Sequence, residues 1–131
     1  MYDSGMEVER ETLLEAEPER VWEALTDDEL LSDWFADRAR IDPWEGGEVE
    51  FEFEDGERRG TVLRVEEERE LEFSWSRDGH GESLVTFTIE PVECGTRLVV
   101  VERALDAPGA MAAWAPRLQA LELCLGSLVL A

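Results

Sequence analysis

The C-terminal stretch, residues 108–131, carries an apolar stripe that fits one long helix. Its members recur at alternating spacings of three and four: Met111, Trp114, Leu118, Leu121, Leu125 and Leu128. Such a stripe follows one face of a helix and needs an apolar surface to lie on. Pro116 falls within this stretch and would cost about 3 kcal/mol inside a regular helix. We therefore expect either a helix that begins late, near Ala115, or a bend at this proline.

The middle of the chain has a period of two, which is typical of half-buried strands. In the clearest case Val49, Phe51 and Phe53 alternate with glutamates. The pattern predicts strands near residues 6–14, 40–42, 49–54, 58–66, 71–75, 85–89 and 98–105. Between two of them, Asp55-Gly56 is a hairpin signal. A helix that covers one face of such a sheet makes an α+β fold.

Two short helices are expected between the first two strands. Pro18 suits the first turn of a helix, where its missing N–H would have no partner in any case. Thr26 and Glu29 match the capping box T-x-x-E, which predicts that Thr26 caps the second helix. The inward side chains of the two helices would be Val21, Trp22, Leu25, Leu30, Leu31 and Trp34.

The chain is strongly acidic. Its 131 residues include 33 acidic and 12 basic side chains, a net charge of −21, and every base is an arginine. This charge argues against nucleic acid and anionic membranes as partners. The composition is similar to that of proteins from salt-adapted microbes, in which about 1 M salt screens the repulsion. A high-GC genome that prefers arginine codons is the alternative explanation.

Length and residue usage narrow the function classes further. The length predicts a single domain, residues 1–131. No apolar run approaches the ~18 residues of a membrane helix, and the N-terminus lacks a signal-like apolar segment, so a cytoplasmic protein is expected. Cys94 and Cys124 form no CxxC pair and His80 is the only histidine, so neither a metal site nor another cofactor is predicted. No G-x-S-x-G motif surrounds any serine, which argues against a serine hydrolase.

Six short phrases follow one another along the chain: PERVWEALTD (18–27), LSDWF (31–35), GGEVEF (46–51), GTVL (60–63), LEFSW (71–75) and GTRL (95–98). Together they resemble the START-like helix-grip superfamily (SRPBCC proteins). Within it they are most similar to the group related to the activator of the heat-shock protein 90 ATPase. The resemblance implies a curved antiparallel sheet of about seven strands wrapped around the C-terminal helix, with a cavity between them.

The same resemblance places a set of side chains around that cavity. They are Trp34, Phe35, Trp44, Phe51, Phe53, Phe73, Trp75, Phe87, Val100, Glu102, Met111, Trp114 and Leu118. Ligand cavities are mostly apolar with a few placed polar groups, which fits this set. Plain core packing is the alternative for its aromatic members.

Glu102 continues the inward face of Leu98 and Val100, so it is the candidate polar group of the cavity. There it would bind a ligand or act as an acid or base. Alternatively, it is a strand-end glutamate that reaches solvent or pairs with an arginine, for which the candidates are Arg103, Arg97 and Arg64.

Three functions remain open at this point. The first is noncatalytic binding of a small hydrophobic or aromatic molecule. The second is a cyclase or hydrolase that uses Glu102 on a polyketide-like substrate. The third is a co-chaperone-like domain that contacts a chaperone. A homodimer through a sheet edge is compatible with each of them.

Overall fold

The computed structural model describes residues 7–77, 81–104 and 114–126. In chain order its elements are β1 (Glu7–Leu14), α1 (Pro18–Thr26), α2 (Asp28–Trp34), β2 (Arg38–Ile41), β3 (Glu48–Phe53), β4 (Gly56–Glu66), β5 (Glu70–Arg77), β6 (Glu82–Val92), β7 (Gly95–Ala104) and α3 (Trp114–Leu125). This order is the one that the sequence predicts.

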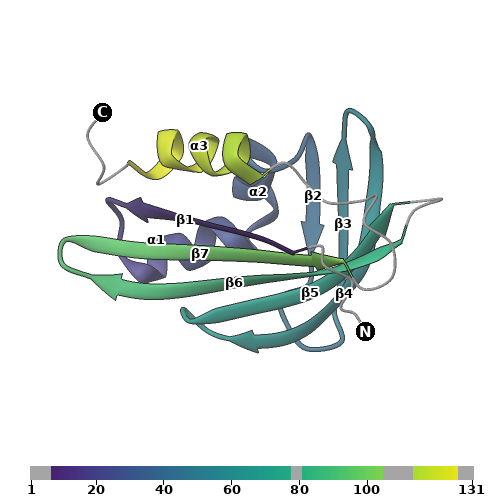
Figure 1. Ribbon diagram of the computed structural model, residues 1–131, viewed down its shortest axis with the longest axis horizontal. Coiled ribbons are helices and arrows are strands. Elements are labelled where there is room, and N and C mark those ends of the chain that lie inside the picture. The colour runs from purple at the N-terminus through teal and green to yellow at the C-terminus, as the bar shows by residue number, and fades with distance from the viewer. Residues whose placement is uncertain (1–6, 78–80, 105–113, 127–131) are drawn as a thin grey trace.

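The seven strands form one antiparallel sheet with the order β1-β7-β6-β5-β4-β3-β2. The helices α1 and α2 connect the two edge strands, β1 and β2, which lie at opposite ends of the sheet. The sheet curves so strongly that β2 and β3 run across the direction of β1, β6 and β7, and α3 lies along its concave side (Figure 1). The fold is therefore the expected START-like helix grip.

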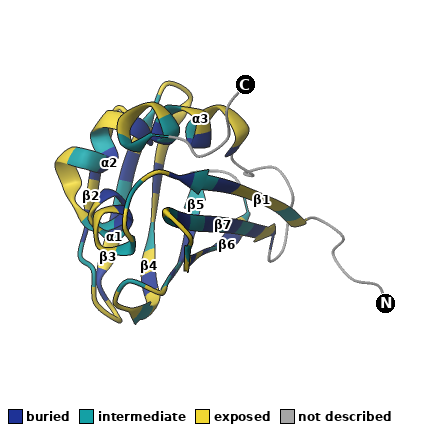
Figure 2. Cartoon of the chain, turned by 90° about the vertical axis from the view of Figure 1, so that its left-hand side faces the viewer, coloured by how far each residue is buried: buried dark blue, intermediate teal, exposed yellow. Residues whose placement is uncertain are grey.

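The core lies between the concave face of the sheet and the helices. Alternate residues of β3, β5, β6 and β7 are buried, as their sequence period predicts (Figure 2). The helices add Val21, Ala24, Leu25, Leu31, Trp34, Trp114, Leu118 and Leu121. Each large apolar side chain buried in this way contributes roughly 1.5–3 kcal/mol to folding before entropic costs.

The start of α2 differs from its prediction. Thr26 is the last residue of α1, and its hydroxyl donates to the carbonyl oxygen of Trp22 at 2.8 Å. The N-cap is Asp27, whose carboxylate accepts from the backbone N–H of Glu29 at 2.9 Å and of Leu30 at 3.1 Å. The prediction that Thr26 caps α2 is therefore wrong. A cap needs an extended backbone, which Asp27 has (φ −99°, ψ 126°), whereas Thr26 is still helical.

Pro116 lies in the first described turn of α3 (Trp114–Leu125), a position that tolerates proline where backbone N–H groups have no partner within a helix. The residues before Trp114, which distinguish a late start from a bend, lie outside the described residues. The far end closes at Gly126, whose φ of +90° lies in the left-handed region that favours glycine at a helix C-terminus. Met111 and Leu128, the outer members of the predicted stripe, lie outside the described residues.

Two strand details shape the sheet. Leu63, predicted to follow the strand pattern, is 46% exposed because it comes directly after the inward-facing Val62 and so lies on the outer face of β4; the register between β4 and β5 shifts between Val62 and Arg64. At Gly60 a Cβ atom would lie 1.6 Å from the carbonyl oxygen of Ser74, so only glycine allows β4 and β5 to approach this closely.

In the described ranges of the chain, no helix has the length and apolarity to cross a membrane.

Candidate functional site

Phe35 lies at the centre of an aromatic cluster between the sheet and α3. It follows α2 directly, and its ring stacks on Trp75 (5.8 Å between centroids, 6° between planes) and on Trp114 (5.4 Å, 15°). The edges of Phe51 and Phe53 meet the same ring at 4.9 and 5.4 Å. Offset stacked and edge-on pairs are the arrangements that aromatic rings prefer. These rings fill much of the space in which the sequence placed a cavity.

Glu102 lies behind this cluster with a fully buried side chain, 0% exposed. Its Oε2 accepts from Trp75 Nε1 at 2.8 Å and from Ser83 Oγ at 2.5 Å, and its Oε1 accepts from Trp114 Nε1 at 2.9 Å. These contacts join β7 to β5, β6 and α3. A carboxylate is stable in such a place only when donors satisfy its oxygens, which they do here.

The buried position of Glu102 contradicts the alternative in which it is a strand-end glutamate at the surface. Neither solvent nor an ion pair with Arg97 or Arg64 holds this side chain, since those two arginines form ion pairs with other glutamates. Arg103 follows Glu102 along the strand and is exposed, so it points to the opposite face of the sheet. With hydrogen bonds to both of its oxygens, Glu102 acts here as an acceptor that holds α3 on the sheet.

Two arginines that the sequence analysis did not single out lie beside the same rings. The guanidinium of Arg58, a residue only 4% exposed, lies 4.7 Å from the ring centroid of Trp75 and 5.4 Å from that of Phe53. The guanidinium of Arg117 lies 4.6 Å from the centroid of Phe53 and 5.8 Å from that of Phe35. Cations over aromatic faces gain about 0.5–2 kcal/mol, more when they are shielded from water.

Burial lowers the pKa of both guanidinium groups. For Arg58, the carboxylates of Glu102 and Asp55 oppose the shift and the charge of Arg117 adds to it. For Arg117, the carboxylates of Asp55 and Glu102 again oppose the effect of burial. Both guanidinium groups thus lie where water stabilises a positive charge less than at the surface.

A signal for both arginines is present in the sequence. Arg58 has the same strand parity as the buried Val62, so it shares the inward face of β4. Arg117 follows Trp114 by three residues and precedes Leu121 by four, so it lies on the apolar stripe of α3. In β4 and in α3 alike, the sequence signal is an arginine at a position that the residue pattern assigns to the inward face.

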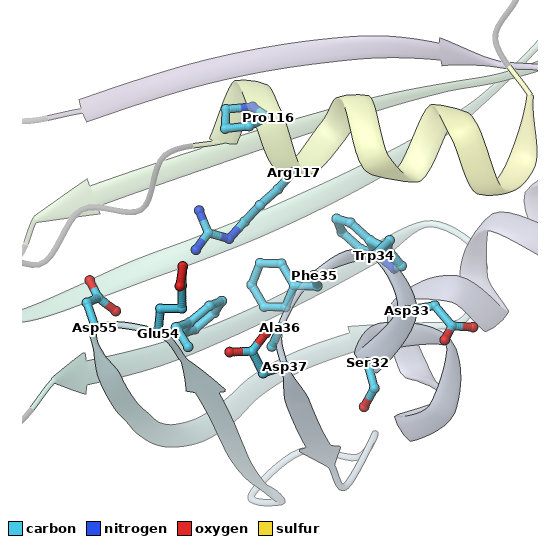
Figure 3. Close-up of a pocket in the computed structure, with 11 residues that line it drawn as sticks. Ser32, Asp33, Trp34, Phe35, Ala36, Asp37, Glu54, Asp55, Pro116 and Arg117 are labelled. Carbon is cyan, nitrogen blue, oxygen red and sulfur yellow. The ribbon is translucent and has the colours of Figure 1, made fainter.

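An open cleft of about 570 Å³ lies in front of the aromatic cluster, between the end of α2, the turn after β3 and the start of α3. Trp34, Phe35 and Phe53 supply its aromatic surface, and Arg117 reaches into it from α3 (Figure 3). The remaining lining residues are Ser32, Asp33, Ala36, Asp37, Glu54, Asp55 and Pro116. This combination of flat apolar rings and one cation is suited to an organic molecule.

The predicted cavity residues divide into four groups. Trp34, Phe35 and Phe53 line the cleft. Buried behind it are Phe51, Phe73, Trp75, Phe87, Val100, Glu102, Trp114 and Leu118. Trp44 is 60% exposed in the connection between β2 and β3 and does not line the cleft. Met111 lies outside the described residues.

Two other hollows of the described surface are lined mainly by charged side chains. One, of about 680 Å³, lies over the start of β4 and the end of β5. The other, of about 330 Å³, lies over β2 and β3. Neither contains an aromatic residue. Among the described residues, no three His, Cys, Asp or Glu side chains gather in a way that would hold a metal ion.

Solved structures with the same fold include proteins of several kinds. A protein from Rhodobacter sphaeroides is 29% identical over 99% of both chains, with a TM-score of 0.73. DynU16, from the dynemicin biosynthetic locus, is 27% identical with a TM-score of 0.78; the match covers 92% of this chain but only 48% of DynU16. An Hsp90 activator from Plasmodium falciparum is 20% identical over 94% of this chain and 98% of its own, with a TM-score of 0.75.

A comparison of the sequence with protein-family models points to the same group of proteins. No curated protein matches the chain. A family model, however, that of activator of Hsp90 ATPase homolog 1-like proteins, matches residues 15–129 and so includes α1 to α3 and all strands except β1. The match covers most of the chain and agrees with the helix-grip fold. The chain therefore belongs to the family of activator of Hsp90 ATPase homolog 1-like proteins.

Proposed function

We propose that this protein binds a small hydrophobic or aromatic molecule in the cleft in front of Phe35, without catalysing a reaction on it. The observation that carries this proposal is the cleft itself, whose volume of about 570 Å³ falls within the range of small-molecule sites and whose lining includes three aromatic residues. A flat ligand can lie against Phe53, the least buried of the three rings, and meet Phe35 and Trp34 only at their small exposed edges, since each of those two is 4% exposed.

The expected affinity is moderate. An aromatic ligand that buries about 200 Å² of apolar surface, the area of one large aromatic side chain, gains roughly 5 kcal/mol. Part of this gain is lost to the ordering of the ligand and of exposed cleft side chains. Dissociation constants from about 0.2 mM to several millimolar are therefore expected for simple aromatic probes.

The hydrogen bonds of Glu102 favour binding over catalysis. A general acid or base has to reach the reacting atom of the substrate. Here Glu102 is buried behind the rings, and three donors from Trp75, Ser83 and Trp114 hold its oxygens. The similarity to DynU16 supports a role with small organic molecules, and a cyclase or hydrolase reaction through Glu102 would require this network to open.

Contact with a chaperone is the second candidate function. The family description and the similarity to the Plasmodium falciparum Hsp90 activator favour it. Co-purification of a heat-shock protein 90-type chaperone with the tagged protein, at molar ratios that persist through size exclusion, would support this role instead.

Native mass spectrometry of the gently purified protein tests the ligand-binding proposal first. An adduct of a few hundred daltons that is released on unfolding is the expected result. Titration with the neutral probe 2-naphthamide, followed by tryptophan fluorescence, tests the site. Phe53→Ala removes an aromatic wall of the cleft and should weaken binding, whereas Trp44→Ala removes an exposed aromatic side chain elsewhere and should not. A bare mass together with no saturable binding of the probe would refute the proposal.

A further inference from the structure

The positive charge of the cleft is concentrated at its inner end. Arg117 crosses the opening above Phe35 and points toward the turn that carries Glu54 and Asp55 (Figure 3). Arg58 lies deeper, and both guanidinium groups lie within 5.4 Å of the centroid of the Phe53 ring. Two positive charges thus lie beside the same aromatic ring. Burial and the neighbouring Arg117 both lower the pKa of Arg58.

The carboxylates of the cleft lie in a different environment. Asp33, Asp37, Glu54 and Asp55 are all exposed at its rim, where water and salt screen their charges. Arg58 is buried and Arg117 is half-buried, so their charges act through a medium of lower dielectric constant. At equal distance a charge pair is worth about four times more at an effective dielectric constant of 20 than in water. At the inner end the charges of two arginines act together with that of one buried carboxylate, Glu102, so the net charge there is positive, although the rim, like the chain as a whole, is negative.

Two carboxylates whose charges act on both arginines, those of Asp55 and Glu102, are also held by other donors. Asp55 Oδ2 accepts from Arg77 Nη1 at 2.7 Å. The oxygens of Glu102 accept from the Trp75, Ser83 and Trp114 donors already described. Asp55 and Glu102 thus have donors besides the two arginines.

On the basis of the proposed binding function, we infer that the natural ligand is a planar organic anion. Its flat apolar part lies against Phe53, and its carboxylate or similar oxyanion faces Arg117, with Arg58 behind. The planar guanidinium fork matches a carboxylate through two parallel hydrogen bonds, which are about twice as strong as neutral ones.

Three probes of one shape and different charge test this inference: 2-naphthoate, neutral 2-naphthamide and the cation 2-naphthylmethylammonium. We expect the naphthoate to bind about tenfold more tightly than the amide, and the cation to bind most weakly. Arg117→Gln should weaken naphthoate binding about tenfold and change amide binding less than about twofold. Arg117→Lys, which keeps the charge but loses the fork, should give an intermediate loss. Arg64→Gln, on the outer face of β4, is the matched control and should change neither affinity.

The outcomes separate this inference from the function on which it rests. If the amide binds in the cleft but the naphthoate has no advantage, or if Arg117→Gln weakens both probes equally, the ligand is not an anion and the inference fails alone. Tighter binding of the cation refutes it in the same way. If none of the probes binds, the proposed function fails and the inference fails with it. Retained amide binding by Arg117→Gln shows at the same time that the variant is folded.

Discussion

Trp114 Nε1 donates a hydrogen bond of 2.9 Å to Oε1 of Glu102, which joins the first residue of α3 to β7 inside the molecule. The other end of the helix is also attached to the sheet. Glu122 accepts a hydrogen bond from the hydroxyl of Thr12 on β1, and Gly126 O accepts from Glu15 N at 2.9 Å. Polar contacts thus fix both ends of α3, while its middle packs through apolar side chains.

Removal of the Glu102 carboxylate should destabilise the protein strongly. Glu102→Ala leaves the buried donors of Trp75, Ser83 and Trp114 without this acceptor, so a loss of about 2–4 kcal/mol in the free energy of unfolding is expected. Glu102→Gln keeps one acceptor oxygen and should lose less. Urea denaturation measures both values, and near-UV circular dichroism should report a changed environment of the tryptophans.

Glu9→Gln, on the exposed face of β1, is the control for this experiment and should lie within about 0.5 kcal/mol of the wild type. Equal, small effects of Glu9→Gln and Glu102→Ala would contradict the role of Glu102 as the acceptor that holds α3.

The fold was predictable because its signals are local. Each strand alternates strongly, as with Val49, Phe51 and Phe53, and one apolar stripe with Trp114 and Leu118 marks the last helix. The cap of α2 was missed for a physical reason. Thr26 and Asp27 are adjacent residues of cap-forming types, and only the backbone shows that the break between the helices falls at Asp27.

Asp27→Ala should therefore cost about 1 kcal/mol, within a usual range of about 0.5–2 kcal/mol, because two backbone N–H groups of α2 lose their acceptor. Glu29→Ala should have almost no effect, since Glu29 would matter only in a capping box formed with Thr26. Thermal unfolding of the two variants side by side measures the difference. The reverse order, with Glu29→Ala the more damaging change, would show that the capping box operates in solution.

Phe35→Ala should be among the most destabilising changes in the aromatic cluster. It removes a ring that contacts Phe51, Phe53, Trp75 and Trp114, and large-to-small changes of this kind cost about 3–5 kcal/mol. Trp44→Ala, a larger truncation at a 60% exposed site, should cost less than about 1 kcal/mol. Chemical denaturation compares the two. A similar loss in both would mean that Phe35 is not a core residue.

The candidate site was less predictable than the fold. Strand parity identified the inward aromatic residues, but it could not show that Phe51 and Trp75 pack behind Phe35 while Phe53 reaches the cleft. That distinction depends on how close each side chain lies to the end of α2. Such contacts join residues that are far apart in the sequence. The contribution of Arg58 and Arg117 was missed because a charged residue at an inward position is usually assumed to face solvent.

Added salt should stabilise the protein, because repulsion among its uncompensated acids outweighs its surface ion pairs. The net charge is −21, and Glu52 on β3 lies directly opposite Glu57 on β4, a like-charge pair that destabilises the sheet. The ion pairs among the described residues involve largely exposed side chains, each worth about 0–1 kcal/mol and likewise weakened by salt. Between about 0.05 and 1 M potassium chloride, which shortens the Debye length to about 3 Å, we expect the midpoint of thermal unfolding to rise by several degrees.

A variant with less charge distinguishes this screening from other salt effects. Glu48→Gln combined with Glu52→Gln removes two exposed acids from the outer face of β3. It should raise the midpoint at low salt and make its dependence on salt shallower, because less repulsion remains to be screened. Chloride is used rather than sulfate, which strengthens apolar burial in any protein. A midpoint that falls with chloride, or a variant with the same salt dependence as the wild type, would show that ion pairs rather than net repulsion control the stability of this acidic chain.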